Sequence, residues 1–392
     1  MSKPVNSTKQ AKYQEEVEKA EKAVEKQVEK AGSTLRRILW IMHRCLACVV
    51  LVLLVGVVTY IAVYKLGVPP NKLQLAAIPA AVLGTLTVLF IWLNRDCWVK
   101  VESKARPEHF AFWLIIVGAF IYAAYKNDLD LMIFVYLFGF GLPVVLINLV
   151  KGQCKPIDYS LLLGVHGGIG AYAMVLLVLW LLQYANIPFT VVTATIAGLA
   201  ALVGALAARG VTPSLALLGV FAAVYTAAPL LGIEPPRLDM TLSGLVHPTG
   251  TIIPYHVLAS FVAALFPPWI VLLWASFVEE TMFRLPLALF KRYGMYFVGF
   301  IVSFFFIYLH IFGYIELEPS TLLQVLTCIA CANAMFVAVY TRTLRLWSSV
   351  VAHLLYNVQV LAQVPLLVSL VMLMLDGILH ILLVRLGILR NE

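Results

Sequence analysis

A succession of long apolar runs is the feature that most constrains this 392-residue chain. A helix of about 20 apolar residues spans a bilayer, because lipid offers no water to hydrogen-bond an open backbone. The sequence therefore predicts an all-α fold, a polytopic membrane helix bundle of roughly 12 spans. The expected spans are 46–64, 75–93, 109–125, 131–150, 161–184, 188–207, 212–232, 268–290, 295–313, 321–341, 347–363 and 365–386.

Composition excludes the other broad classes of protein. The chain is 62% hydrophobic and 12% charged, whereas an average soluble domain is about 25% charged. A water-soluble surface cannot be built from so few charged residues. The net charge of +8 is concentrated in tails and short loops, where it indicates membrane topology rather than a nucleic-acid partner. We therefore expect an integral membrane protein, surrounded by lipid, with no nucleic-acid partner.

The first 44 residues differ from the rest of the chain. They hold ten Lys and Arg residues, and segment 14–30 is rich in helix formers. Glu15 and Lys19 are spaced to pair on one helix face. Short loops rich in Lys and Arg face the cytoplasm. The tail therefore predicts a cytoplasmic N-terminus with a solvated helix, and the even number of spans predicts a cytoplasmic C-terminus as well.

Ionisable residues inside apolar spans mark the last third of the chain. Glu279, Glu280 and Arg284 all lie within span 268–290. Each such group costs at least about 2.5–3.5 kcal/mol at the centre of a membrane helix, so it indicates a functional site. Glu280 and Arg284 are four residues apart and can pair on one helix face. Glu279 points about 100° away from them, towards a different wall.

Two later spans add imidazole and amide groups. His310 lies in span 295–313, and His353 and Asn357 lie one helical turn apart in span 347–363. Carboxylates and imidazoles together can activate water as general bases, with or without a metal. An imidazole and Asn357 can donate hydrogen bonds to a developing oxyanion. Each element alone is typical of helix packing, whereas their conjunction within about 80 residues indicates a catalytic site. The remaining histidines, which lack such company, are interpreted as structural or loop residues: His43, His109, His166, His247, His256 and His380.

The three elements resemble the signature of the CPBP family of membrane proteins, which includes the CAAX proteases and bacteriocin-processing enzymes and is also called the ABI family. Its pattern is E-E-x-x-x-R, then F-x-x-x-H, then H-x-x-x-N, on successive membrane helices. The chain supplies Glu279-Glu280 with Arg284, then Phe306 with His310, then His353 with Asn357, in that order and without departure. The resemblance covers about residues 250–370.

The resemblance implies an intramembrane endopeptidase with an eight-helix core at the C-terminal side. That core is expected at 160–388, preceded by the charged tail 1–44 and by four additional spans at 45–150. The substrate implied is a peptide or protein at the membrane, of which the prenylated tail cut by type II CAAX prenyl endopeptidases is one form.

The resemblance also implies roles for individual residues. Glu279 and His310 would activate water, while His353 and Asn357 would hold the oxyanion. The supporting residues would be three: Glu280 and Arg284 would orient that pair, and Phe306 would pack beside them. No H-E-x-x-H zinc helix is present. The use of a divalent metal such as zinc stays open, with Glu279, His310 and His353 as candidate ligands.

Two alternative functions stay open at this stage. A proton- or ion-coupled transporter would also place Glu, His and Arg residues inside spans. Against a transporter, the predicted spans in the first half of the chain contain no comparable group of Glu, His and Arg residues. The second alternative is a catalytically silent scaffold that keeps the same fold and binds a membrane partner.

Overall fold

The protein is described from a computed structural model, and its regular structure in the described residues is entirely helical. The residues described are 67–99, 159–184, 213–234, 268–289, 294–311 and 317–389, with Tyr314 and short pieces within 15–64, 118–126 and 202–206. The chain divides into two compact units, Met1–Leu54 and Val55–Glu392.

The first unit agrees with the helix predicted from its charge pattern. Its described residues are helical and mostly exposed. The predicted pair is present, because Lys19 Nζ lies 2.6 Å from a carboxylate oxygen of Glu15. Lys22 and Glu18 repeat the same geometry at 2.6 Å. Such exposed pairs contribute only about 0.3–0.5 kcal/mol each, so they support a helix locally without anchoring it elsewhere.

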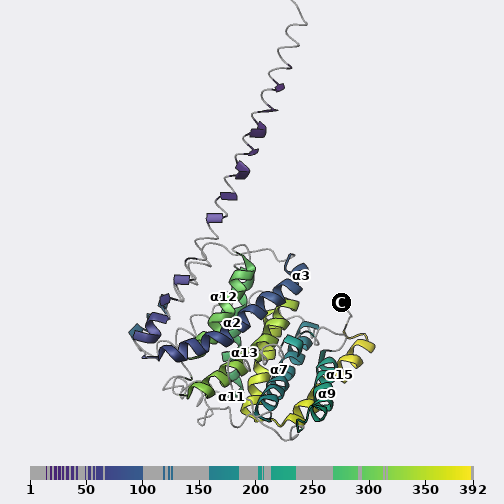
Figure 1. Ribbon diagram of the computed structural model, residues 1–392. Helices are drawn as coiled ribbons and strands as arrows, with labels where there is room; N and C mark the ends of the chain where they lie inside the picture. Colours follow the sequence, from purple (N-terminus) through teal and green to yellow (C-terminus); the bar gives the residue numbers. More distant parts are fainter. Residues whose placement is uncertain are drawn as a thin grey trace, which may run out of the picture. The chain divides into compact units, whose positions relative to one another are not determined.

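The second unit contains nine described helices, which Figure 1 labels where there is room. They are α2 (Pro70–Leu93), α3 (Arg95–Val99), α7 (Tyr159–Tyr184), α9 (Pro213–Leu230), α11 (Pro268–Leu289), α12 (Met295–His310), α13 (Pro319–Thr343), α14 (Leu346–Leu361) and α15 (Leu366–Arg385). Eight of these coincide with predicted spans, and Pro365 separates the last two helices. The predicted spans 109–125, 131–150 and 188–207 lie wholly or mostly outside the described residues, so the total of 12 stays a prediction. Span 46–64 is described in part, and its described residues are helical.

Five described helices are long and apolar enough to cross a membrane: α2, α7, α9, α13 and α15. This confirms the polytopic all-α bundle. Helices α12 and α14 are apolar but shorter, and α11 carries the three charged residues that lower its hydropathy. Among the five, α7 and α13 are the inner helices, buried along 89% and 83% of their most apolar windows, against 28% for α9 and α15.

Helix α2 packs closely along α12 and α13, as Figure 1 shows. Two glycines make the approach possible. A Cβ on Gly84 would come within 3.0 Å of the Phe300 carbonyl oxygen, and one on Gly299 would meet Ile91 at 2.6 Å. The Thr87 hydroxyl also donates to Ser303 Oγ at 2.8 Å. The predicted division at 45–150 and 160–388 stays a prediction, but α2 and the motif-bearing α12 share one interface.

We predict that Gly84→Val lowers the melting temperature of the full-length protein in detergent. The added side chain meets a backbone oxygen that cannot yield, and overpacking of this kind costs about 1–3 kcal/mol. The control is Gly219→Ala, because nothing lies within 4 Å of a Cβ at that helical position. A Gly84→Val protein that melts like the wild type would show that the α2–α12 contact contributes little to stability.

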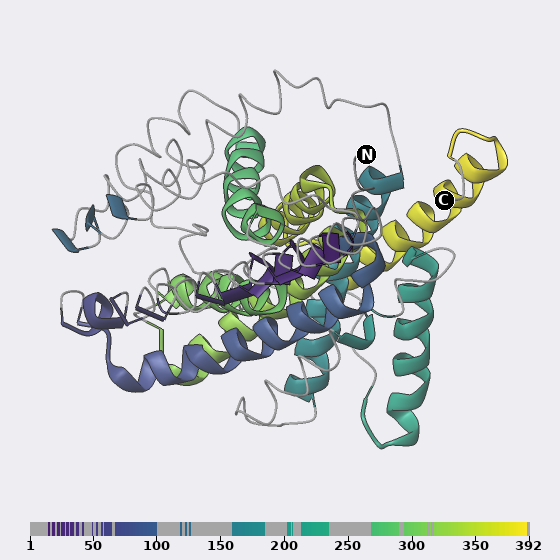
Figure 2. The ribbon, with the colours of Figure 1, turned by 90° about the horizontal axis from the view of Figure 1, so that it is seen from above.

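A buried polar cluster fixes α15 against α7 and α9, which also lie beside each other in the turned view (Figure 2). Asp376 of α15 accepts a hydrogen bond from Ser214 of α9 and pairs with Nδ1 of His166 on α7. Ser214 Oγ is also 2.6 Å from that nitrogen, and His166 Nε2 lies 3.5 Å from His380 Nδ1. All four side chains are buried. His166 and His380 therefore do have polar company, contrary to the reason for which the sequence analysis set them aside. Their contacts join three helices, and a structural role stays our interpretation.

We predict that Asp376→Ala destabilises the protein by about 1–3 kcal/mol, because it removes the acceptor for two buried groups. Asp376→Asn keeps an acceptor oxygen and should lose less. Chemical denaturation in detergent, followed by tryptophan fluorescence, measures both effects. If neither variant differed from the wild type, the cluster would contribute nothing to holding α15.

Candidate active site

Helix α11 places three charged side chains inside the bundle. Glu280 and Arg284 are fully buried, and Glu279 is 7% exposed. The helix continues without a break through these residues and packs against α12 and α14. Since a buried charge is stable only when paired and hydrogen-bonded, the neighbouring helices must supply partners.

Arg284 is held by residues of two helices. Its Nε lies 2.9 Å from Glu280 Oε2, so the pair expected from their four-residue spacing is present. Its Nη2 lies 3.4 Å from Glu280 Oε1 and also donates to Oδ1 of Asn333 on α13. The guanidinium stands over the Phe306 ring, 5.7 Å from its centroid. These contacts join α11 to α12 and α13.

Both oxygens of Glu280 are occupied by donors. Ser349 of α14 donates to Oε2, which also faces Arg284. His353, one turn further along α14, places Nδ1 3.0 Å from Oε1. A carboxylate surrounded by an arginine, a hydroxyl and an imidazole is a poor acceptor for a further proton. Glu280 is therefore suited to hold its neighbours in place rather than to activate water.

Glu279 has a more open environment. Its Oε2 lies 3.5 Å from His353 Nε2, so the imidazole of His353 stands between the two adjacent glutamates. Tyr314, in the connection between α12 and α13, lies close enough to interact electrostatically with Glu279. Burial raises the pKa of Tyr314 to about 12, and the nearby carboxylate adds to the shift. The phenol therefore keeps its proton at neutral pH and can donate a hydrogen bond.

Asn357 continues the polar face of α14. It is buried, one turn after His353, and its Nδ2 donates to Ser276 Oγ on α11 at 3.3 Å. A primary amide has two N–H groups, so one remains for another acceptor. The Phe336 ring of α13 stacks on His353 at 4.9 Å between centroids, which restricts the imidazole orientation.

His310 is the one predicted residue that stands apart from this network. Its Nδ1 is 2.5 Å from the backbone oxygen of Phe306, and the two rings lie 4.5 Å apart. Phe306 in turn meets Phe283 of α11 edge to face. Within the described residues His310 makes no hydrogen bond or ion pair with Glu279. Its side chain reaches the site through Phe306 rather than directly.

The candidate metal ligands do not come together. Of Glu279, His310 and His353, only the first and third are in contact. In the described part of the chain, no group of three or more His, Cys, Asp or Glu side chains is arranged to hold a metal ion. The described residues, as they are arranged, do not form a zinc site, and we assign no step to a metal.

Sequence reasoning did not identify three polar residues that complete the site: Ser276, Asn333 and Ser349. Serine and asparagine commonly hydrogen-bond between packed membrane helices, so nothing in the sequence distinguishes these three from ordinary packing residues. Ser349 and Ser276 did carry one usable signal. Each lies four residues before a motif residue, His353 or Glu280, and therefore on the same helix face.

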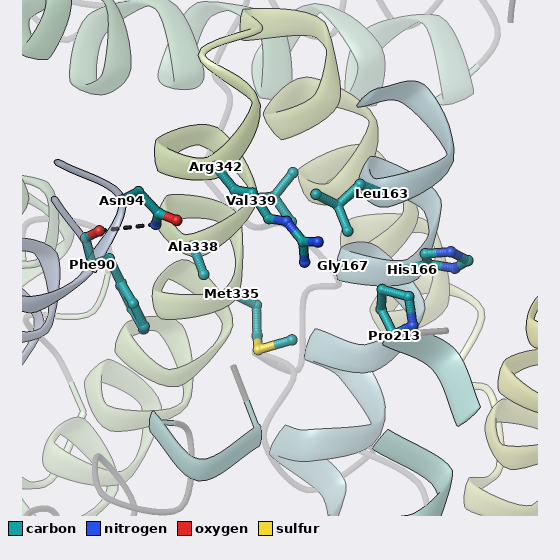
Figure 3. A pocket seen from close by; sticks show the side chains of 10 residues that line it. All are labelled: Phe90, Asn94, Leu163, His166, Gly167, Pro213, Met335, Ala338, Val339 and Arg342. Carbon is teal, nitrogen blue, oxygen red and sulfur yellow. Dashed lines mark hydrogen bonds between the residues drawn. The ribbon is translucent and has the colours of Figure 1, made fainter. Parts of the chain in front are cut away.

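A pocket of about 30 Å³ lies elsewhere in the bundle. Figure 3 shows its lining side chains, with Arg342 extending between Val339 and His166. On α13 the pocket is lined by Met335, Ala338, Val339 and Arg342, whereas Asn333 and Phe336 contact the site. Helical geometry puts these two sets on opposite faces of α13. The pocket is therefore separate from the candidate active site.

We predict that Arg284→Ala destabilises the full-length protein by about 3–5 kcal/mol, because it leaves Glu280 buried without its cation. Thermal unfolding in detergent is the measurement. Arg345→Ala is the matched control, since that arginine is exposed at the start of α14. Equal melting temperatures for the two variants would contradict a stabilising role for the buried pair.

Comparison with known proteins agrees with the three motifs. Residues 243–359 match the family model described as Type II CAAX prenyl endopeptidase Rce1-like. The matched segment contains all seven motif residues from Glu279 to Asn357. The family suggested by the motifs is thus confirmed for this part of the chain, and it supports an intramembrane endopeptidase in general. The chain matches no curated protein and no solved structure.

Proposed function

We propose that this chain, which carries a domain of the CAAX prenyl endopeptidase type, cleaves a peptide bond at the membrane by general-base activation of water. The observation that carries the proposal is the pair of adjacent glutamates on α11. Glu280 is enclosed by Arg284, Ser349 and His353, whereas Glu279 makes its one ion pair among the described residues with the imidazole of His353 and lies near Tyr314.

Glu279 is the proposed base. Both oxygens of Glu280 are engaged by neighbouring groups, so Glu279 is the carboxylate left to take a proton from the attacking water. The resulting hydroxide would add to the peptide carbonyl and form a tetrahedral oxyanion. Return of the proton to the amide nitrogen would then allow the C–N bond to break and release an amine and a carboxylate.

Asn357 and His353 are the proposed stabilisers of the oxyanion. Helix packing already orients Asn357, whose Nδ2 donates to Ser276 and has a second N–H. His353 would donate from Nε2, the nitrogen that Glu280 does not hold and that lies 3.5 Å from Glu279. His310 keeps the role implied by the family resemblance, as a second group on the attacking water. Its contact with Phe306 would let that ring set its position.

The proposed substrate is a peptide or protein segment held at the membrane. A lipid-modified C-terminal tail is the specific form that the family description implies. Such a tail delivers its scissile bond to membrane depth, where Glu279 and His353 lie in the bundle.

The function is tested by incubating the purified full-length protein with prenylated and unmodified peptides and mapping the products by mass spectrometry. We expect the wild type to release a short C-terminal fragment from a prenylated peptide. Glu279→Gln, which is nearly isosteric, should abolish turnover and leave the melting temperature close to that of the wild type.

Two results would overturn the proposal or its roles. Absence of cleavage of every peptide by the wild type would favour a silent scaffold or a transporter. If Glu279→Gln remained active and Glu280→Gln lost activity without loss of stability, the roles of the two glutamates would be reversed.

A further inference from the structure

One row of contacts crosses from α14 to α11 and back. Ser349 Oγ donates to Glu280 Oε2, Glu280 Oε1 faces His353 Nδ1, and His353 Nε2 faces Glu279. Ser349 and His353 are four residues apart on α14, so the two α14 members of the row belong to one helix face. The orientation of the His353 imidazole therefore depends on the orientation of the Glu280 carboxylate, which Ser349 contacts.

The two nitrogens of an imidazole are not equivalent. The partner of Nδ1 determines which tautomer is present and how the ring is turned, and so what Nε2 presents to its own partner. Here Nδ1 is engaged by Glu280, which leaves Nε2 for Glu279. Rotation of the Glu280 carboxylate would move Oε1 and release the ring.

Arg284 and Ser349 both meet Oε2 and oppose that rotation. Arg284 lies on α11 itself, four residues from Glu280, and approaches Oε2 from the same helix. Ser349 approaches the same oxygen from the opposite helix and is fully buried. Arg284 reaches both oxygens from α11 itself, with Nη2 3.4 Å from Oε1, whereas Ser349 is the hydroxyl donor that holds Oε2 from a second helix.

We infer that Ser349 is a positioning residue of the active site: through Glu280 it holds the His353 imidazole with Nε2 directed at Glu279. This inference rests on the proposed function for its catalytic consequence. The contact itself, between Ser349 and Glu280, can be tested without any substrate.

The chain supplies a matched control at the neighbouring position. Ser348 is also buried on α14, but its hydroxyl donates to the Arg345 carbonyl at 2.6 Å and contacts Thr343 at 2.6 Å. Ser348→Ala therefore deletes the same atom from the same helix without touching Glu280. Ser349→Thr keeps the hydroxyl and serves as the conservative variant.

For the kinetic test, the full-length variants cleave the peptide that the wild type cleaves best. We expect Ser349→Ala to lower kcat about 10- to 100-fold with KM unchanged, as is typical when the partner of a functional imidazole is removed. Ser348→Ala should match the wild type, and Ser349→Thr should recover most of the loss. Wild-type kcat in Ser349→Ala, or an equal loss in Ser348→Ala, would overturn the inference.

For the substrate-free test, melting temperatures are measured for Ser349→Ala, Glu280→Gln and the double variant. Groups in direct contact have non-additive effects, so the double variant should lose less than the two single shifts combined. Shifts for Ser348→Ala and Glu280→Gln should add. Additive shifts for Ser349 and Glu280 would refute the positioning contact, even if the wild type cleaved no peptide and the proposed function failed.

Discussion

The buried ion pair of Glu280 and Arg284 determines how α11, α13 and α14 pack together. Two charges in a low-dielectric interior attract one another strongly, but they also lose their hydration, so the pair alone is not a stable arrangement. Hydrogen-bond donors and acceptors on other helices replace part of the hydration that the two charges lose. Asn333 of α13 accepts from Arg284, and Ser349 and His353 of α14 contact Glu280. Each partner restricts the rotation of its helix, because a turn of one residue would take it out of reach of the pair.

The motif residues were predictable because ionisable side chains are costly, and therefore rare, inside a membrane helix. Charged and imidazole side chains in apolar runs have few explanations besides function, so Glu279, Glu280, Arg284 and His353 could be grouped before any geometry was known. The grouping predicted the Glu280–Arg284 pair, which the spacing alone determines. It did not predict that His353 would stand between the two glutamates while His310 turns to a backbone carbonyl, because these contacts depend on how separate helices rotate. Ser349 and Asn333 were not predictable for a related reason, since their residue types are ordinary in such helices.

Asp376 is a buried carboxylate whose polar cluster was not predicted from the sequence. It is a lone carboxylate in the apolar run 365–386, which is the signal that identified α11. Its partners are His166 and Ser214, which lie 210 and 162 residues earlier in the chain. No spacing rule connects residues so far apart. The cluster joins α15 to α7 and α9. A second interface, close-packed at Gly84 and Gly299, joins α2 to the motif-bearing α12.

The order of these residues along the chain has a consequence for biogenesis. Asn333 follows Arg284 by 49 residues, and Ser349 follows Glu280 by 69. Translation at about 5–20 residues per second therefore leaves roughly 3–14 s between synthesis of Glu280 and synthesis of Ser349. During that interval α11 carries its charges without the partners that satisfy them in the folded bundle. Until then Glu280 and Arg284 have only each other, and the remaining polar contacts of the pair are complete only when α14 has been made.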